Sequence, residues 1–221
     1  SNLEVIRETT DYVRALTNTL RDRESEALEN QRLSDLGRQE AIREIAQDGL
    51  KELGPHRRRT ATTNEALTRV TTLALDYMTL PDGGDRLEAL LLAQEVRAEF
   101  RGQSQAERDS AFIQAAGRLD RTTMRAFQTA PAGPWISGEV LRRAERAYAE
   151  RRNPEAYATL ERLTQLRDHL LALSRFLAGA LLRYGVEPRT LEQALGFTLV
   201  EMAIDEPPKP LAFTRREAGR G

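Results

Sequence analysis

From Leu3 to Leu53 apolar and polar residues are interspersed, at first with a helical spacing, and no proline or turn cluster interrupts the segment. Val5 and Ile6 begin the apolar pattern, Val13 follows Ile6 after seven residues, and Leu16 and Leu20 follow at intervals of three and four. This spacing predicts an amphipathic helix. Further along, the spacing loosens, and Ser34 and Gly37 lie close together inside the segment. The sequence therefore predicts either one long helix, or two helices with a break near Ser34–Gly37 that form a hairpin or a kinked arm.

The apolar stripe of this N-terminal arm, residues 1–54, needs a partner if the arm projects from a compact body. Val13, Leu16 and Leu20 form the stripe, and burying each of these side chains contributes roughly 1.5–3 kcal/mol. Arg23 falls where a strict heptad repeat needs an apolar residue, so a coiled coil along the whole arm is not favoured. We expect Val13, Leu16 and Leu20 to contact another protein, either a second copy of the chain or other members of a larger assembly.

Gly54-Pro55 predicts the end of the arm, because glycine followed by proline is a recurrent helix ending. The polar stretch that follows predicts a linker over residues 55–63. This linker contains the densest positive charge of the chain, Arg57, Arg58 and Arg59. Three arginines beside several threonines suit contact with the phosphate backbone of a nucleic acid or with an acidic partner. A flexible basic linker without a ligand is the alternative interpretation.

Residues 64–204 carry a succession of helix signals and predict a helical bundle. Ser104 and Glu107 form the pattern of a capping box. Asn153-Pro154 is a cap followed by proline at the first helical position. The sequence predicts helices over residues 65–80, 85–101, 104–119, 122–130, 137–152, 155–184 and 188–204.

The helix over residues 155–184 has the most regular apolar stripe, which runs from Leu160 to Leu181. We expect it to be the central scaffold of the bundle, with Leu170 and Leu173 most deeply buried. In the helix over residues 85–101 we expect the core face to consist of Leu87, Leu90, Leu91, Val96 and Phe100. The proline-containing residues 205–221 predict an extended C-terminal tail.

The chain's single tryptophan, Trp135, lies between rigid breaks in the stretch Ala130–Gly138, which contains Pro131 and Pro134. Tryptophan is frequent among residues that anchor a protein partner, so Trp135 is a candidate interaction residue. The alternative is structural, with the indole ring filling a junction between helices.

Composition favours an all-α fold and limits the available chemistry. No segment of useful length alternates in the manner of a β-strand. The net charge of −1 gives no long-range attraction for nucleic acid or membranes. The absence of cysteine excludes disulfides and thiolate sites. No apolar run reaches the roughly 18 residues of a membrane span, and no apolar segment follows Ser1–Glu4, so we expect neither a membrane span nor a signal peptide.

No catalytic or metal-binding motif is recognisable in the chain. The two histidines, His56 and His169, lack further ligands at helical spacing and are interpreted as polar residues of a helix surface or pocket edge. Gly83-Gly84 lacks the Lys-Ser/Thr ending of a phosphate-binding loop. We therefore expect no catalytic residues, no cofactor and no metal. A helical enzyme without a known motif is the least favoured alternative.

The layout around Trp135 consists of a short helix, the stretch APAGPWISG, an Arg/Glu-rich helix, and the Asn153-Pro154-Glu155 start of a long helix. This order resembles that of small uncharacterised helical proteins encoded among the virion genes of tailed bacteriophages. The resemblance covers roughly residues 104–180 and is one of loop layout. It implies a virion or assembly role and supplies no functional residue to transfer.

The sequence thus favours a non-enzymatic structural or assembly protein that acts through helical protein–protein contacts with copies of itself or with other proteins. The expected location is cytoplasmic or virion-associated. A nucleic-acid-binding adaptor that uses Arg57, Arg58 and Arg59 is the alternative.

Overall fold

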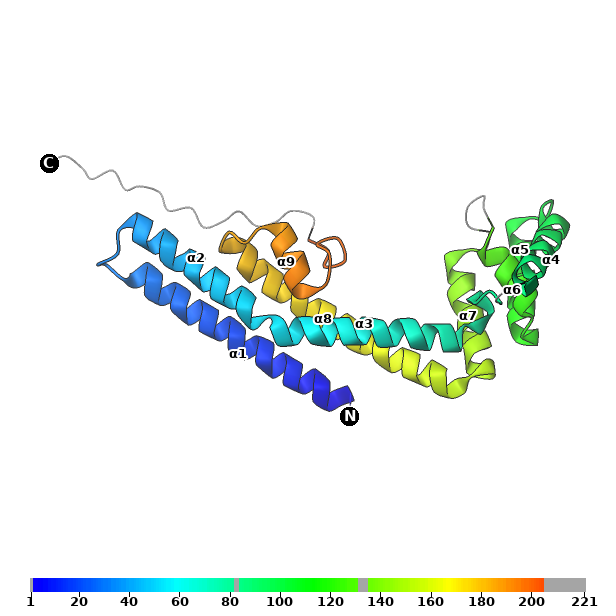
Figure 1. Cartoon of the computed structure of the whole chain (residues 1–221), viewed down its shortest axis with the longest axis horizontal. Helices are drawn as coiled ribbons and strands as arrows, with labels where there is room; N and C mark the ends of the chain where they lie inside the picture. The colour runs from blue at the N-terminus through cyan, green and yellow to red at the C-terminus, as the bar shows by residue number, and fades with distance from the viewer. Residues whose placement is uncertain (1, 82–83, 131–134, 205–221) are drawn as a thin grey trace. The chain divides into compact units, whose positions relative to one another are not determined.

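The computed structural model describes residues 2–81, 84–130 and 135–204 (Figure 1). The described residues form α-helices and one short 3-10 helix and contain no β-strand, so the all-α prediction is confirmed. The elements are α1 (Asn2–Glu29), α2 (Asp35–Glu52), α3 (Gly54–Ala74), η1 (Asp76–Met78), α4 (Gly84–Phe100), α5 (Gln105–Arg118), α6 (Arg121–Gln128), α7 (Gly138–Arg152), α8 (Pro154–Arg183) and α9 (Pro188–Leu195). No helix in these ranges combines the length and the apolar composition needed to cross a membrane.

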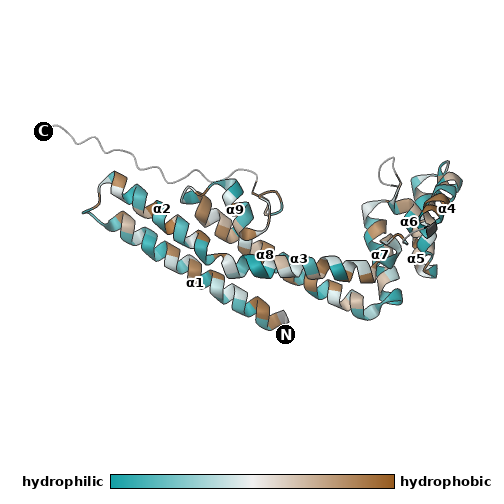
Figure 2. Cartoon of the chain, in the orientation of Figure 1, coloured by the Kyte–Doolittle hydropathy of each residue, from teal (hydrophilic) through white to brown (hydrophobic). Residues whose placement is uncertain are grey.

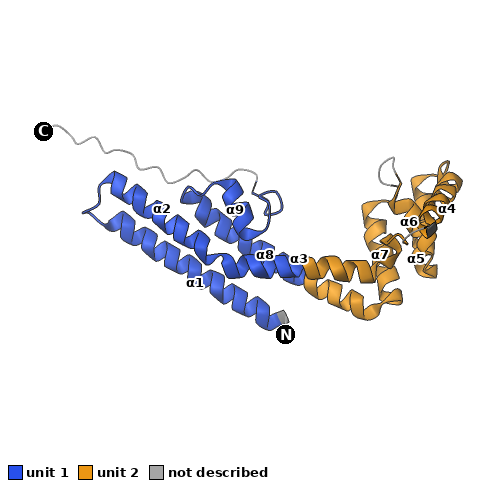
Figure 3. Cartoon of the chain, in the orientation of Figure 1, with its two compact units in different colours: residues 1–64, 164–221 blue, residues 65–163 orange. Residues whose placement is uncertain are grey.

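The chain divides into two compact units, each with its own apolar core (Figure 3). Unit 1 contains residues 1–64 and 164–221, and unit 2 contains residues 65–163. The division falls inside α3 and α8, so each unit holds part of both helices. This differs from the expected division into an arm of residues 1–54 and a bundle of residues 64–204. The expected tail, residues 205–221, lies outside the described residues.

In unit 1 the N-terminal segment is a helical hairpin, one of the predicted alternatives. Helix α1 ends at Glu29, and α2 runs back along it from Asp35 (Figure 1). Ser34 caps α2, since its hydroxyl accepts a hydrogen bond from the backbone N–H of Gly37 at 3.1 Å. The break between α1 and α2 therefore lies before Ser34.

The C-terminal half of α8 supplies the centre of unit 1. Leu170, Leu177 and Leu181 are buried there among apolar residues of α1, α2 and α9. Leu173 is half-buried, so the expected deep burial is correct for Leu170 only. The long helix is therefore a scaffold for the N-terminal hairpin, which the sequence had assigned to a separate arm. Helix α9 is shorter than predicted, because Gly196 ends it in the left-handed conformation with φ of 77°.

The predicted linker over residues 55–63 is wrong, because these residues form the first part of α3. Helix α2 stops at Glu52 and α3 starts at Gly54, with Leu53 between them in a helical conformation. Proline is tolerated in the first turn of a helix, where its missing N–H has no partner to lose. Gly54-Pro55 therefore separates two helices without adding an extended segment.

Unit 2 is a cluster of short helices in which α6 packs on α4 and α5, and α5 packs on α7. The predicted capping box of Ser104 and Glu107 is present at the start of α5. Asp120 caps α6 by accepting a hydrogen bond from the N–H of Thr123 at 3.1 Å. The core contains the following buried aromatic and large apolar side chains: Tyr77, Phe112, Met124, Phe127, Ile136 and Tyr148.

Candidate functional site

Helix α4 in unit 2 has an exposed row of leucines on one side. Leu87, Leu90 and Leu91 are 65%, 39% and 52% exposed. At 3.6 residues per turn these three side chains fall within an arc of roughly 100°. We call this row the leucine face. Figure 2 shows that the ribbon of α4 includes hydrophobic residues as well as hydrophilic ones.

The opposite side of α4 holds the helix against unit 2. Ala89 and Ala93 are buried there, and small side chains at this spacing let α6 approach closely. Phe100 meets Phe127 of α6 edge to face, with ring centroids 5.0 Å apart. Arg97 donates hydrogen bonds to the carbonyl of Ala126 and the hydroxyl of Thr129 near the end of α6. The leucine face therefore belongs to a firmly packed helix.

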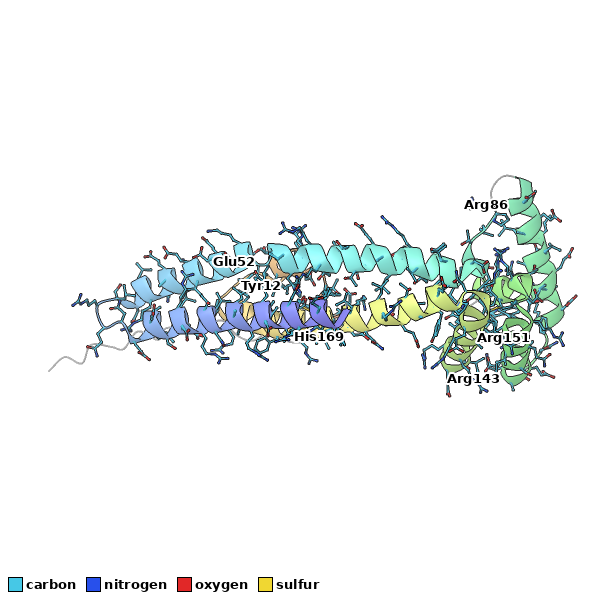
Figure 4. The ribbon with its side chains drawn as sticks, turned by 90° about the horizontal axis from the view of Figure 1, so that it is seen from below. Tyr12, Glu52, Arg86, Arg143, Arg151 and His169 are labelled. Atoms are coloured by element: carbon cyan, nitrogen blue, oxygen red, sulfur yellow. The ribbon has the colours of Figure 1, made fainter. Side chains whose placement is uncertain are left out.

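Charged residues of opposite sign border the leucine face. Arg86 lies along one edge, near the N-terminal end of α4 (Figure 4). Glu88, Glu95 and Glu99 lie along the other edge, as the helical repeat requires. All four side chains are exposed and make no ion pair with another described residue. Their charges remain available to a partner.

The size of the leucine face can be expressed as a free energy. The exposed fractions of Leu87, Leu90 and Leu91 together equal about one and a half fully exposed leucines. Full burial of such a side chain contributes roughly 1.5–3 kcal/mol, so covering the face is worth roughly 2–5 kcal/mol. Scattered single leucines on a surface need no explanation, whereas contiguous apolar patches larger than a few hundred Å² are typical of interaction sites.

The sequence predicted that Leu87, Leu90 and Leu91 belong to the core face of this helix, and that prediction is wrong. This surface was therefore not expected from the sequence. Of the expected core face, Val96 and Phe100 are half-buried. The available signal was the pair Ala89 and Ala93, four residues apart, on the side away from Leu87. A helix with alanines on one side and leucines on the other has two apolar sides, and only one can face a small core.

The residues predicted for self-association, Val13, Leu16 and Leu20, are instead buried in the core of unit 1. The hairpin folds α1 onto α2 and α8, so the stripe is already covered by the chain itself. The prediction that these three residues form an exposed contact surface is therefore wrong. A helix that looks unpartnered in a sequence can be covered by segments far along the chain.

Trp135 has the structural environment of a helix junction in unit 2. Its ring is half-buried, lies 5.9 Å from the ring of Phe127, and stacks below the Arg108 guanidinium at 5.6 Å. Its carbonyl accepts hydrogen bonds from Gln105 and Arg108 at 2.9 and 3.3 Å. The indole ring is therefore in contact with other residues of unit 2, in agreement with the alternative interpretation that it fills a junction between helices. The prolines at 131 and 134 lie outside the described residues.

The structure does not bring Arg57, Arg58 and Arg59 together as one phosphate site. All three are on α3, where Arg57 and Arg58 are exposed. Arg59 is half-buried, pairs with Glu8 at 3.0 Å and donates a hydrogen bond to Thr9 of α1. One of the three charges is therefore already neutralised within unit 1.

The interpretation of His56 as a polar residue of a helix surface or pocket edge is also wrong. His56 is buried, and its Nε2 is joined to Ser174 Oγ by a hydrogen bond of 2.7 Å. Burial, together with the nearby Arg59 charge, lowers the pKa of His56 to about 4. A histidine beside a serine has the geometry of a base and a nucleophile. Both side chains are buried, however, so a substrate in solvent does not reach them, and the pair forms part of the interior packing of unit 1.

The other histidine, His169 on α8, is half-buried in unit 1 (Figure 4). Its Nε2 and the hydroxyl of Thr10 on α1 are 2.9 Å apart. This contact ties α1 to α8.

Unit 2 contains a polar network around η1. Tyr77 donates a 2.6 Å hydrogen bond to Glu145, and Tyr148 donates one to Asp76. Burial raises the pKa of Glu145, although the Tyr77 hydrogen bond opposes this, and burial and Asp76 raise the pKa of Tyr148 to about 12. Arg152 pairs with Asp76 at 3.2 Å. The members satisfy one another, so the network fastens η1 to α7.

An open groove of about 430 Å³ lies between α1 and α2. Leu16 and Leu20 form part of its apolar lining, and the pairs Tyr12–Glu52 and Arg23–Asp48 cross from one helix to the other (Figure 4). Burial, assisted by the Glu52 charge, raises the pKa of Tyr12. The Tyr12 hydroxyl is used by the backbone carbonyl of Glu52, and Arg23 and Asp48 neutralise each other, so these groups are already engaged within unit 1.

The described ranges contain no group of three or more histidine, aspartate or glutamate side chains placed to hold a metal ion. Comparisons with protein-family models, with curated proteins and with solved structures found no match for this chain. Its function must therefore be inferred from its own surfaces.

Proposed function

We propose that this chain is a non-enzymatic structural or assembly protein that binds a helical partner through the leucine face of α4. The observation that carries the proposal is the exposure of Leu87, Leu90 and Leu91 on a helix that is fixed from its other side. Helical partners commonly insert residues spaced three and four positions apart into such a surface.

The electrostatic setting supports a protein partner of mixed charge. Arg86 borders one edge of the face and Glu88, Glu95 and Glu99 border the other. Opposite charges along the two edges select the partner and its orientation more than they add affinity. An anionic membrane surface is a poorer match, since three of these four charges are negative.

A nucleic-acid-binding role has less support. The chain has a net charge of −1, and Arg59 is engaged by Glu8. Arg57 and Arg58 alone would give a small electrostatic contribution. The virion setting implied by the resemblance in loop layout stays a prediction.

The test is capture of partners by the full chain from extracts of its native host, in parallel with two variants. Leu87→Ser combined with Leu91→Ser removes the centre of the leucine face. Leu36→Ser is the matched control, because Leu36 is 62% exposed but lies on α2 in unit 1. Both variants change solvent-exposed side chains, so both are expected to keep the melting temperature of the parent.

We expect proteins that are retained by the parent and by Leu36→Ser to be lost from the double variant. If all three chains retain the same proteins, the leucine face of α4 does not bind the partner and the proposal is wrong. Circular dichroism of each chain verifies that the helical content is unchanged.

A further inference from the structure

We infer that the leucine face of α4 pairs with the same face of a second copy of this chain, with the two helices parallel and in register. This inference rests on the proposed function and specifies its partner. It follows from three features of α4: its apolar face, the polar residue in the middle of that face, and the distribution of charge along its edges.

The apolar seam has the spacing of a short two-stranded coiled coil. Leu87, Leu91 and Ala98 follow one another at intervals of four and seven residues, with Leu90 beside Leu91. Such a row lets each side chain pack between side chains of a facing helix. A second copy presents an identical row, so in a parallel pair in register Leu87 faces Leu87 and Leu91 faces Leu91.

Gln94 lies in the middle of the seam and is exposed. In a parallel pair that is in register, Gln94 faces Gln94 of the second copy, and the two amides can hydrogen-bond to each other. In an antiparallel pair centred on the face, Gln94 would lie against Leu91, and its buried amide would lack a partner. One polar residue in such a seam specifies register and orientation.

The charges at the edges favour the same orientation. In a parallel pair related by a twofold axis along the helices, Glu88 and Glu95 face the edge of the other copy that contains Leu90 and Arg86, so glutamates do not face glutamates. In an antiparallel pair, each edge faces its own equivalent, which brings the three glutamates close to glutamates. Like charges in facing positions are unfavourable, and opposite charges set the orientation.

The length of α4 limits the strength of this association. The helix has 17 residues, and three leucines form most of its face. Specific stable interfaces bury about 1,200–2,000 Å² in total, and a seam of this length lies at or below the low end. We expect a dissociation constant on the order of 100 µM, so the dimer forms at high local concentration.

Single engineered cysteines test the orientation directly, because the natural chain has no cysteine. Leu87→Cys and Ala98→Cys place one thiol at either end of the seam. The purified full chains are oxidised at several concentrations, separately and as a mixture, and disulfide-linked dimers are quantified on non-reducing gels. Leu36→Cys on α2 is the control for random collision.

In a parallel pair, each of the two seam variants links to itself, and we expect each to exceed the control at least five-fold. An antiparallel pair would give links mainly in the mixture, and that result would overturn the inference. Yields equal to the control in every sample would also overturn it.

Sedimentation equilibrium of the cysteine-free chain gives a second measurement. We expect weak dimerisation that Leu87→Ser combined with Leu91→Ser abolishes and that Arg86→Glu weakens several-fold. A monomer at every concentration would overturn the self-pairing. If the chain is a monomer but partner capture depends on the leucine face, the proposed function still stands and only the self-pairing fails. If partner capture does not depend on the leucine face either, both the self-pairing and the proposed function fail.

Discussion

Gly49 on α2 gives the sharpest test of the packing in unit 1. A Cβ atom added at Gly49 would lie 3.0 Å from Cδ2 of Leu181 and 3.2 Å from Cδ2 of Leu20. Carbon atoms in good van der Waals contact are about 3.5–4.0 Å apart. Gly49→Ala therefore requires neighbouring side chains to move by a few tenths of an ångström.

The two neighbours differ in their freedom to move. Leu20 borders the open groove between α1 and α2 and can shift toward it. Leu181 is fully buried in the core and has no such space. Overpacking of this kind costs typically 1–3 kcal/mol, while replacing a helical glycine by alanine contributes about 0.5–1 kcal/mol. We expect Gly49→Ala to lower the free energy of unfolding by about 0.5–2 kcal/mol.

Gly179→Ala on α8 is the matched control. Gly179, like Gly49, lies near the C-terminal end of its helix in unit 1 and does not have a positive φ. Apart from its two chain neighbours and the nearby backbone of α8 itself, no atom lies within 4 Å of a Cβ added there. The alanine should therefore stabilise the chain by about 0.5–1 kcal/mol through the helix alone.

The assay is urea unfolding followed by circular dichroism, with thermal melting as a second measurement. For a chain of this size, 1 kcal/mol corresponds to about 2–4 °C in melting temperature. The two variants should move in opposite directions and differ by about 1–3 kcal/mol. If both raise stability by the same amount, α1, α2 and α8 do not meet closely at Gly49, and the packing described for unit 1 is incorrect.

Three further predictions concern the two cores. Leu170→Ala should cost about 2–5 kcal/mol in urea unfolding, because the side chain is buried at the centre of unit 1, and a loss below 1 kcal/mol would contradict this. The unfolded state binds the His56 proton more tightly, with a pKa near 6.5 against about 4 when folded, so stability should fall as pH drops from 6.5 to 4. His56→Gln should reduce that slope, and an unchanged slope would show that His56 is not buried. Tyr77→Phe should cost about 1.5–3 kcal/mol by removing a hydrogen bond to half-buried Glu145, whereas Tyr157→Phe, at an exposed hydrogen bond, should change stability by less than about 0.5 kcal/mol.

Local signals in the sequence predicted the helices because a helix end is decided by a few neighbouring residues. The Ser104–Glu107 capping box and the Asn153-Pro154 start both lie where the sequence placed them. The prediction failed at Gly54-Pro55, where the residues that end α2 also begin α3. The same local chemistry permits a linker or an immediate second helix, and only packing of α3 selects between them.

The burial of each helix face was decided by tertiary structure. Val13, Leu16 and Leu20 have the pattern of an interaction stripe, but α2 and α8 cover them. Leu87 and Leu91 have the pattern of a core face, but α4 turns Ala89 and Ala93 inward. Periodicity shows that a helix has an apolar side and cannot show which distant segment covers it. The sequence by itself determined an all-helical chain without a recognisable chemical motif, and the long-range packing decided which apolar face was left exposed.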